Sequence, residues 1–307
     1  MQYSKKLEKQ RLEKELLCGK GIYDKANNTL YIENIPFIYK TLKNLLKYSG
    51  IYKKWQENAL NVRIRHESWS FAHLPEEFDG FKILQISDIH IDAMPELAEI
   101  LPEMIAGIEF DLAVFTGDFR FDIHHNNAKI DYLLKDIFAE ANNTKYGAYG
   151  IMGNHDYLHY TEENVEKAGL KMLINESLKL RINNSEITII ALDDMHYYQT
   201  GRLFDFRDTL KESGFKLLLE HSPEIYREAA LYGIDFYLCG HTHGGQVCLP
   251  GEIPMISNCR SGRKFNQGRW QYKSLQGYTS NGVGTSGLPI RWNCPPEIVI
   301  HKLKVKR

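Results

Sequence analysis

Five short motifs carry the side chains of this chain that are best suited to hold metal ions. Each follows a run of apolar residues. They are Asp88-Ile89-His90, Gly117-Asp118, Gly153-Asn154-His155-Asp156, Glu220-His221-Ser222 and Gly240-His241-Thr242-His243. The seven ligands that they supply are Asp88, His90, Asp118, Asn154, His221, His241 and His243. Seven ligands suit two ions that share one bridging carboxylate, so the pattern predicts metal-assisted hydrolysis.

The spacing within the motifs favours shared ions. Asp88 and His90 are two residues apart, so in extended backbone both side chains point to one side. His241 and His243 repeat this spacing. Asp118 follows a glycine that allows a tight turn, and a carboxylate is the side chain here best able to bridge two cations. We therefore expect Asp118 to lie between the two ions.

The mixed ligand chemistry favours borderline divalent ions. Two Asp, one Asn and four His suit Mn²⁺, Fe²⁺ or Zn²⁺ better than Ca²⁺; we expect Mn²⁺ first, with Mg²⁺ as a further candidate. A single Gly-Asp is usually only a turn. The hypothesis therefore depends on all five motifs occurring in one chain. The remaining histidines near them are expected to be solvated or hydrogen-bonded, and include His124, His125, His159 and His196.

Alternating strands and helices must position these motifs. The apolar runs that predict strands are 82–87, 111–116, 146–152, 187–192, 215–219 and 235–239, with a last strand at 297–303. Helices are predicted at 95–106, at 130–141, from Thr161 as an N-cap, and at 223–231. This alternation predicts an α/β fold whose sheet is covered on both faces. The motifs follow strands, which is where open α/β folds place their sites.

Residues 1–60 differ from the rest, and we expect an N-terminal extension followed by a catalytic domain at 61–307. The extension is rich in Lys, Leu and Tyr and carries none of the motifs. Gly21–Asn34 predicts a hairpin that turns at Asn27-Asn28. Pro36–Ser49 predicts a basic amphipathic helix ended by Gly50. The extension is expected to lie at a membrane interface or over the substrate, or else to pack on its own domain.

Composition limits the partners and the compartment. Lys and Arg total 38 and Asp and Glu total 39, so the near-neutral chain is no general polyanion binder and no nucleic-acid partner is expected. The five dispersed cysteines fit reduced thiols. We see no signal peptide and no apolar run long enough to cross a membrane. We expect a cytoplasmic protein, with peripheral attachment to the inner face of the membrane as an option; the oligomeric state is left open.

Together, the motifs resemble the calcineurin-like metallophosphoesterase superfamily over roughly Phe81–Pro250. The resemblance implies a four-layer α/β/β/α sandwich and a hydrolase of phosphoric esters. It implies one metal site made of Asp88, His90, Asp118 and His243, and a second made of Asp118, Asn154, His221 and His241. His155 would be a nonligand acid that protonates the leaving group or steadies the transition state, and Asp156 would orient it.

Arg120 is a further candidate for catalysis. It lies two residues after Asp118, where it could reach a nonbridging phosphate oxygen. Pairing with Asp122 or another nearby acid is the alternative.

Four segments resemble a bacterial branch of membrane-associated phosphohydrolases, namely Leu219–Glu224, Gly240–Val247, Gly282–Arg291 and Cys294–Ile298. Within that branch, Thr116–Arg120 and Gly153–Tyr157 look similar to enzymes that split UDP-2,3-diacylglucosamine into a lipid monophosphate and UMP during lipid A assembly. The substrate is expected to be phosphorylated and small or lipid-linked. Another phosphodiesterase or a phospholipid phosphatase is the main alternative. The near-neutral charge disfavours a nuclease. The absence of an Asp-Arg-Gly continuation at Gly117-Asp118 disfavours a protein phosphatase, and the complete ligand set disfavours a metal-free scaffold.

Overall fold

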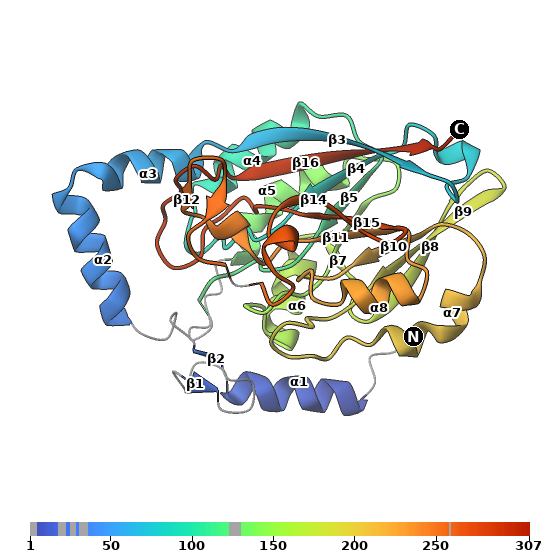
Figure 1. Ribbon diagram of the computed structural model, residues 1–307, viewed down its shortest axis with the longest axis horizontal. Helices are drawn as coiled ribbons and strands as arrows, with labels where there is room; N and C mark the ends of the chain where they lie inside the picture. The colour runs from blue at the N-terminus through green and yellow to red at the C-terminus, as the bar shows by residue number, and fades with distance from the viewer. Residues whose placement is uncertain (1–4, 18–22, 25–28, 31–35, 123–129, 258) are drawn as a thin grey trace.

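The computed structural model describes residues 5–17, 23–24, 29–30, 36–122, 130–257 and 259–307. These residues form two six-stranded sheets (Figure 1). The first sheet has the order β3 (Arg63–Phe71), β16 (Glu297–Val305), β4 (Lys82–Ile86), β5 (Leu112–Phe115), β6 (Ala148–Gly150) and β7 (Lys171–Met172). The second has the order β14 (Gly268–Tyr272), β15 (Leu275–Thr279), β11 (Phe236–Cys239), β10 (Lys216–Leu219), β9 (Ser185–Ala191) and β8 (Glu176–Ile182).

The strands that precede the motifs are parallel to their neighbours. In the first sheet β4, β5 and β6 pair in parallel, and in the second β9, β10 and β11 do the same. All four residues of β5 are buried, as are those of β10 and β11. Continuous burial is expected of strands covered on both faces. Parallel pairing brings the carboxyl ends of these strands to one edge of each sheet.

Helices cover the outer faces of the two sheets. Ile83 of β4 packs between the sheets with Leu217 and Phe236, whereas its neighbour Leu84 packs outward with Leu101 and Leu134. The helices on the first sheet are α4 (Leu97–Ala106), α5 (Ile130–Asn142) and α6 (Leu158–Lys167). Those on the second are α7 (Arg207–Lys211) and α8 (Tyr226–Leu231). The predicted four-layer α/β/β/α sandwich is therefore confirmed.

Three predicted helices begin at other residues, and the first of them, expected from residue 95, begins at Leu97. Another was expected to begin after Thr161, but α6 begins at Leu158. Thr161 Oγ1 accepts a hydrogen bond of 2.9 Å from the backbone N–H of Tyr157, so the threonine caps the helix from within its first turn. The helix expected at 223–231 begins at Tyr226.

The N-terminal part contains three helices, α1 (Lys5–Leu17), α2 (Pro36–Tyr48) and α3 (Ile51–Leu60), and a pair of short strands, β1 (Tyr23–Asp24) and β2 (Thr29–Leu30). The two strands pair antiparallel, as predicted; the expected turn at Asn27-Asn28 lies outside the described residues. Gly50, with φ of 74°, separates α2 from α3. Of these helices, α2 extends away from the sandwich, whereas α1 runs along it (Figure 1).

The expected extension makes contacts with the rest of the chain. Tyr52 of α3 packs with Leu288 and Ile290, and Trp55 stacks on Trp292 at a centroid distance of 5.2 Å. A short hairpin of β12 (Cys248–Leu249) and β13 (Ile253–Pro254) completes the elements. Among the described helices, none combines the length and apolar character needed to cross a membrane.

Candidate metal centre

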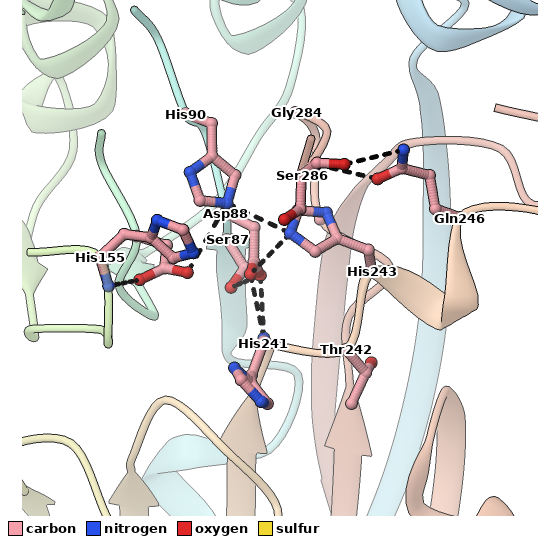
Figure 2. Close-up of polar contacts among 12 residues, drawn as sticks. Ser87, Asp88, His90, His155, His241, Thr242, His243, Gln246, Gly284 and Ser286 are labelled. Atoms are coloured by element: carbon pink, nitrogen blue, oxygen red, sulfur yellow. Dashed lines mark hydrogen bonds and ion pairs between the residues drawn. The ribbon is translucent and has the colours of Figure 1, made fainter. Parts of the chain in front are cut away.

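All five motifs converge where the two sheets present the carboxyl ends of their parallel strands. Asp88 and His90 follow β4, Asp118 follows β5, and the 153–156 loop follows β6. From the second sheet, His221 follows β10, and 241–243 follow β11. Figure 2 shows Asp88, His90 and His243 pointing toward one another, with His155 beside His90. The topology therefore gathers side chains that lie up to 155 residues apart, from Asp88 to His243.

One group of ligand atoms comes from Asp88, His90 and His243. His90 Nε2 lies 3.2 Å from His243 Nε2, and His243 Nε2 lies 3.5 Å from Asp88 Oδ1. The three ligand atoms lie within 4.8 Å of one another. Nitrogen and oxygen atoms bound to one small divalent cation must lie this close, so the group could hold an ion.

A second group surrounds Asn154. Its Oδ1 lies 2.8 Å from His241 Nδ1 and 3.1 Å from His221 Nε2. Asp118 joins this group to the first, since its Oδ2 lies 3.2 Å from His221 Nε2 and 3.6 Å from His90 Nε2. The structure thus brings all seven predicted ligands together and places Asp118 where a bridging carboxylate would be needed.

Backbone carbonyls orient two of the imidazoles. His90 Nδ1 lies 2.8 Å from the carbonyl oxygen of Arg120, and His221 Nδ1 lies 2.7 Å from that of Thr116. A carbonyl only accepts, so Nδ1 must donate in both rings. Burial lowers the pKa of His90 to about 4, so this ring is neutral and turns an unprotonated Nε2 toward the cluster, which is the form that binds a metal. With Nδ1 held by the Thr116 carbonyl, the Nε2 of His221 is the nitrogen that would bind a metal once its proton is lost.

Left-handed backbone aims the ligands, and here the structure differs from the sequence-based expectation. We expected extended backbone to point Asp88 and His90 to one side. Instead their φ angles are 52° and 45°, and Asp118, His241 and His243 also have positive φ, of 57°, 71° and 50°. Each such residue costs on the order of 1–3 kcal/mol, and persists only where surrounding contacts enforce it. Here the backbone N–H groups of Asp88 and His90 donate to the carbonyls of Gly117 and Asp118, at 3.0 and 3.1 Å.

Gly117 is required by the close approach of the motif loops. Its φ is 89°, and a Cβ at this position would lie 2.7 Å from the nitrogen of Gly153 and 2.8 Å from Nδ1 of His221. Any larger residue would push the Asp118 turn away from the two loops that complete the second group.

His155 lies at the edge of the cluster. Its ring packs edge-on to His90 at a centroid distance of 4.9 Å, its backbone N–H donates to Asp118 Oδ1 at 2.8 Å, and one of its ring nitrogens lies within 4.8 Å of the ligand atoms of His90 and Asp118. The residue expected to orient it, Asp156, has other contacts. The Asp156 carboxylate accepts from the backbone N–H groups of Gly153, Asp118 and Phe119, at 2.8, 2.8 and 3.1 Å. The imidazole is oriented instead by the carbonyl of Phe121, 2.8 Å from Nδ1, so Asp156 shapes the loop rather than the ring.

Arg120 directs its side chain toward aromatic rings. Only 2% of the residue is exposed, and its guanidinium lies 4.8 Å from the ring centroid of Tyr160 and 5.6 Å from that of Tyr157. It also donates to the carbonyl oxygen of Asp122. These contacts favour the alternative that Arg120 pairs locally, here with the backbone carbonyl of Asp122. Contact between Arg120 and a phosphate stays a prediction.

Burial and neighbouring charges set the protonation of the cluster. For His241 and His243, burial first and adjacent histidines second lower the pKa well below its usual value, so both rings are neutral. Burial also acts to lower the pKa of His221, but the Asp118 carboxylate outweighs it and raises that pKa well above normal. Burial acts to raise the pKa of Asp118, but the positive charge of His221 outweighs burial and holds this pKa well below its usual value. A cation bound there must displace the His221 proton, so binding should strengthen as pH rises.

Several supporting residues have no signal in the local sequence. His196 was expected to be hydrogen-bonded rather than a ligand: its Nδ1 lies 2.7 Å from Glu224 Oε1, and its ring packs 4.0 Å from that of His241. His159 lies 3.3 Å from Glu8, while His124 and His125 lie outside the described residues.

Arg291 supports the Asp88 loop from a distance in the sequence. It is fully buried and donates to the carbonyls of Asn281 and Gly284, both at 2.6 Å. The N–H of Gly284 in turn donates to the carbonyl of Asp88 at 2.8 Å.

The four described cysteines, Cys239, Cys248, Cys259 and Cys294, are free thiols in the structure, and the expected reducing compartment stays a prediction. Cys18 lies outside the described residues.

Glu220 makes stability depend on pH. Burial, followed by the charge of Asp194, raises the pKa of this carboxyl to about 8. Between its unfolded pKa of about 4.3 and that value, the folded protein binds the proton and the unfolded chain does not, so the free energy of unfolding falls as pH rises. We expect wild type to lose on the order of a few kcal/mol more than Glu220→Gln between about pH 5 and about pH 9. Urea unfolding of the metal-free proteins measures this difference.

Glu109→Gln serves as the control, because the Glu109 side chain is 93% exposed. Its unfolding free energy should follow that of wild type at every pH. A Glu220→Gln curve parallel to both would show that Glu220 is ionised in the folded protein.

Comparison with known proteins places the motifs in a family. A model of the calcineurin-like phosphoesterase family matches residues 81–245, more than half of the chain. The uncharacterized metallophosphoesterase YkuE of Bacillus subtilis is 31% identical over 243 residues, covering 75% of this chain and 82% of that protein. An uncharacterized metallophosphoesterase of Aquifex aeolicus is 32% identical over 240 residues, covering 73% and 85%. The phosphodiesterase YaeI of Escherichia coli is 27% identical over 277 residues, covering 87% and 97%. The matched segment contains all five motifs.

Proposed function

Because this chain belongs to the calcineurin-like phosphoesterase family and is therefore a metal-dependent hydrolase of phosphoric esters, we propose that it cleaves a phosphodiester or pyrophosphate bond in a lipid-linked substrate. The specific candidate is UDP-2,3-diacylglucosamine, cleaved to a lipid monophosphate and UMP. The observation that carries the proposal is the cluster of seven ligand side chains around Asp118.

The donor atoms fit two divalent cations. The proposed first set is Asp88, His90, Asp118 and His243, and the proposed second set is Asp118, Asn154, His221 and His241. Three carboxylate or amide side chains and four imidazoles favour Mn²⁺, with Fe²⁺, Zn²⁺ and Mg²⁺ as alternatives. When bound, such a pair of ions neutralises charge on a phosphoryl group and makes a water nucleophilic at neutral pH.

The protein's own groups complete the proposed mechanism. His155 holds a proton on Nδ1 against the carbonyl of Phe121, so a second proton on Nε2 is the one it can give to a leaving oxygen. The Asp156 carboxylate keeps the 153–156 loop against the Asp118 turn, which fixes His155 relative to the ligands. The positive-φ backbone of five ligands holds their side chains in place before substrate binds.

A diester attached to a lipid is favoured by two observations. The Escherichia coli relative is named a phosphodiesterase. In addition, α2 and the start of α3 expose Leu45, Tyr48 and Ile51, at 63%, 93% and 42%. Exposed lysines lie beside them, namely Lys47, Lys53 and Lys54. Apolar side chains flanked by lysines suit an anionic membrane surface, and the proposed location is the cytoplasmic face of the cell membrane.

A side-by-side assay tests the substrate. The Mn²⁺-loaded protein would be offered a UDP-linked diacylsugar, bis(p-nitrophenyl) phosphate and a phosphopeptide, with products identified by mass spectrometry. The proposal expects UMP from the first, slower hydrolysis of the second, and an unchanged phosphopeptide. Hydrolysis of the simple diester without UMP release would exclude the specific candidate and leave a different diester, and turnover of the phosphopeptide alone would contradict the proposal.

The α2–α3 surface should bind vesicles. Combined Leu45→Ser, Tyr48→Ser and Ile51→Ser removes the apolar side chains that would enter the interface, and is expected to weaken binding to anionic phospholipid vesicles by at least about tenfold. Sedimentation with vesicles measures it. The control combines Phe204→Ser with Leu231→Ser, two exposed apolar residues of the second sheet's helical layer, at 57% and 79%. Equal vesicle binding by the two variants would contradict a membrane role for α2.

A further inference from the structure

Helix α1 reaches the metal-binding edge through a buried arginine. Arg11 has no exposed surface, although it lies on a helix made mostly of Lys, Glu and Leu. Its Nη1 donates to Asp193 Oδ1 at 2.6 Å, and its Nη2 donates to the carbonyls of Gly153, at 3.3 Å, and of Asp156. The two carbonyls bracket Asn154 and His155, which are a proposed ligand and the proposed acid.

Two further residues of α1 contact the segments on either side of Arg11, one near α6 and one in the 193–198 loop. Glu15 Oε1 accepts from Arg11 Nε and from the backbone N–H of Leu158, both at 2.8 Å, so α1 also holds the first residue of α6. Lys14 Nζ donates to the carbonyl of Tyr198 at 2.5 Å. The Arg11 guanidinium lies 3.4 Å from the centroid of the Tyr198 ring. Helix α1 therefore joins the 153–158 segment to the 193–198 loop.

The charge balance makes Arg11 the central contact. Asp193 is fully buried, and its second oxygen, Oδ2, accepts from Thr200 Oγ1 at 2.5 Å. A buried carboxylate needs a paired cation, and removing the cation alone is strongly destabilising. Apolar burial contributes less to the docking, since Leu7 is buried but Leu16 is 68% exposed. The polar contacts of Arg11 thus decide where α1 lies.

We propose that Arg11 is a positioning residue for the 153–156 loop, and that α1 is a structural part of the metal centre. The effect on turnover rests on the proposed function, whereas the effect on the loop and on metal affinity does not. Arg11 acts on the outer side of the loop through the carbonyls of Gly153 and Asp156. The Asp156 carboxylate acts on the inner side, on the N–H groups of Gly153 and Asp118. Held from both sides, Asn154 keeps its oxygen between His221 and His241.

The test replaces Arg11 with Met in the full chain. Arg11→Met keeps a long apolar stem but removes the donors. We expect faster hydrogen exchange at the amides of 153–158 in the metal-free protein and about 10–100-fold weaker binding of the second Mn²⁺ in a calorimetric titration. For diester hydrolysis, kcat should fall by a larger factor than KM changes. Lys9→Met, on an exposed position of the same helix, should match wild type in all three measurements.

Two further variants keep the proposal testable if Arg11→Met folds poorly. Arg11→Lys retains the charge but has one nitrogen in place of the three that contact Glu15, Asp193 and the two loop carbonyls, so it should restore the stability of the fold more than the Mn²⁺ affinity. Asp193→Asn removes the buried charge, so the double variant with Arg11→Met should be more stable than Arg11→Met alone while still showing fast exchange at 153–158. Exchange and Mn²⁺ affinity equal to wild type in Arg11→Met, or in the double variant, would overturn the proposal. Wild type that binds two Mn²⁺ ions but hydrolyses no diester would instead count against the proposed function.

Discussion

Asp118→Ala is expected to reduce diester hydrolysis to background and to remove at least one metal ion per chain. Asp118 is the side chain whose oxygen approaches ligands of both groups, at 3.6 Å from His90 Nε2 and 3.2 Å from His221 Nε2. Its loss also removes the acceptor for the backbone N–H of His155. The loss in turnover should be on the order of 10³-fold or more, which corresponds to about 4 kcal/mol or more in the activation barrier.

The matched variant for this test is Asp118→Asn. It has nearly the same shape and can still accept from the His155 N–H, but it has lost the charge that two cations share. We expect the Asp118→Asn variant to bind one ion and to be almost as inactive as the Asp118→Ala variant. Metal content by mass spectrometry and turnover of bis(p-nitrophenyl) phosphate would be measured on the same samples. Two tightly bound ions and substantial turnover in Asp118→Ala would rule out a bridging role.

His155→Ala is expected to keep both metals and lose about 10²–10⁴-fold in turnover on a substrate with a poor leaving group. His155 lies beside His90, but its Nδ1 is directed to the carbonyl of Phe121 and its position is fixed by Asp118. A residue that only donates a proton should be dispensable for metal binding. The measurement pairs kcat for an alkyl phosphodiester with the Mn²⁺ stoichiometry of each variant.

Leaving-group dependence separates acid catalysis from a structural role. A p-nitrophenolate leaves without protonation, so His155→Ala should lose much less turnover on a p-nitrophenyl diester than on an alkyl diester. Asp156→Asn is a useful comparison, because Asp156 holds three backbone N–H groups of the loop and its loss should affect both substrates alike. Loss of a metal ion in His155→Ala would show that His155 is a ligand, as its closeness to His90 and Asp118 would allow.

The sequence predicted the parts of the site that depend on strand ends. Apolar runs located β4, β5, β6, β10 and β11 to within two residues, and parallel pairing then brought the motifs that follow them to one edge of each sheet. The way the ligands are aimed was not predictable from spacing. Asp88 and His90 converge through left-handed turns enforced by carbonyls of the Asp118 loop, which is a tertiary contact.

Helices α1 and α2 show the same limit of prediction from local sequence. The alternation of apolar and basic residues in Pro36–Ser49 is a local pattern, so α2 could be predicted. Helix α1 has no such pattern, because it docks through Arg11, whose partner Asp193 lies 182 residues away in sequence. A single buried ion pair has no periodic signal. Similarly, the orientation of Asp156 toward backbone N–H groups and of Arg120 toward Tyr160 depends on loops that close only in the folded chain.

Anomalous diffraction from crystals grown with Mn²⁺ would show directly whether these residues form a two-metal centre. We expect two peaks that share Asp118, one bound by Asp88, His90 and His243 and the other by Asn154, His221 and His241. They should lie about 3.5–4 Å apart, as in other two-metal hydrolytic sites. A single peak at saturating Mn²⁺, or a pair of peaks that does not share Asp118, would contradict this arrangement.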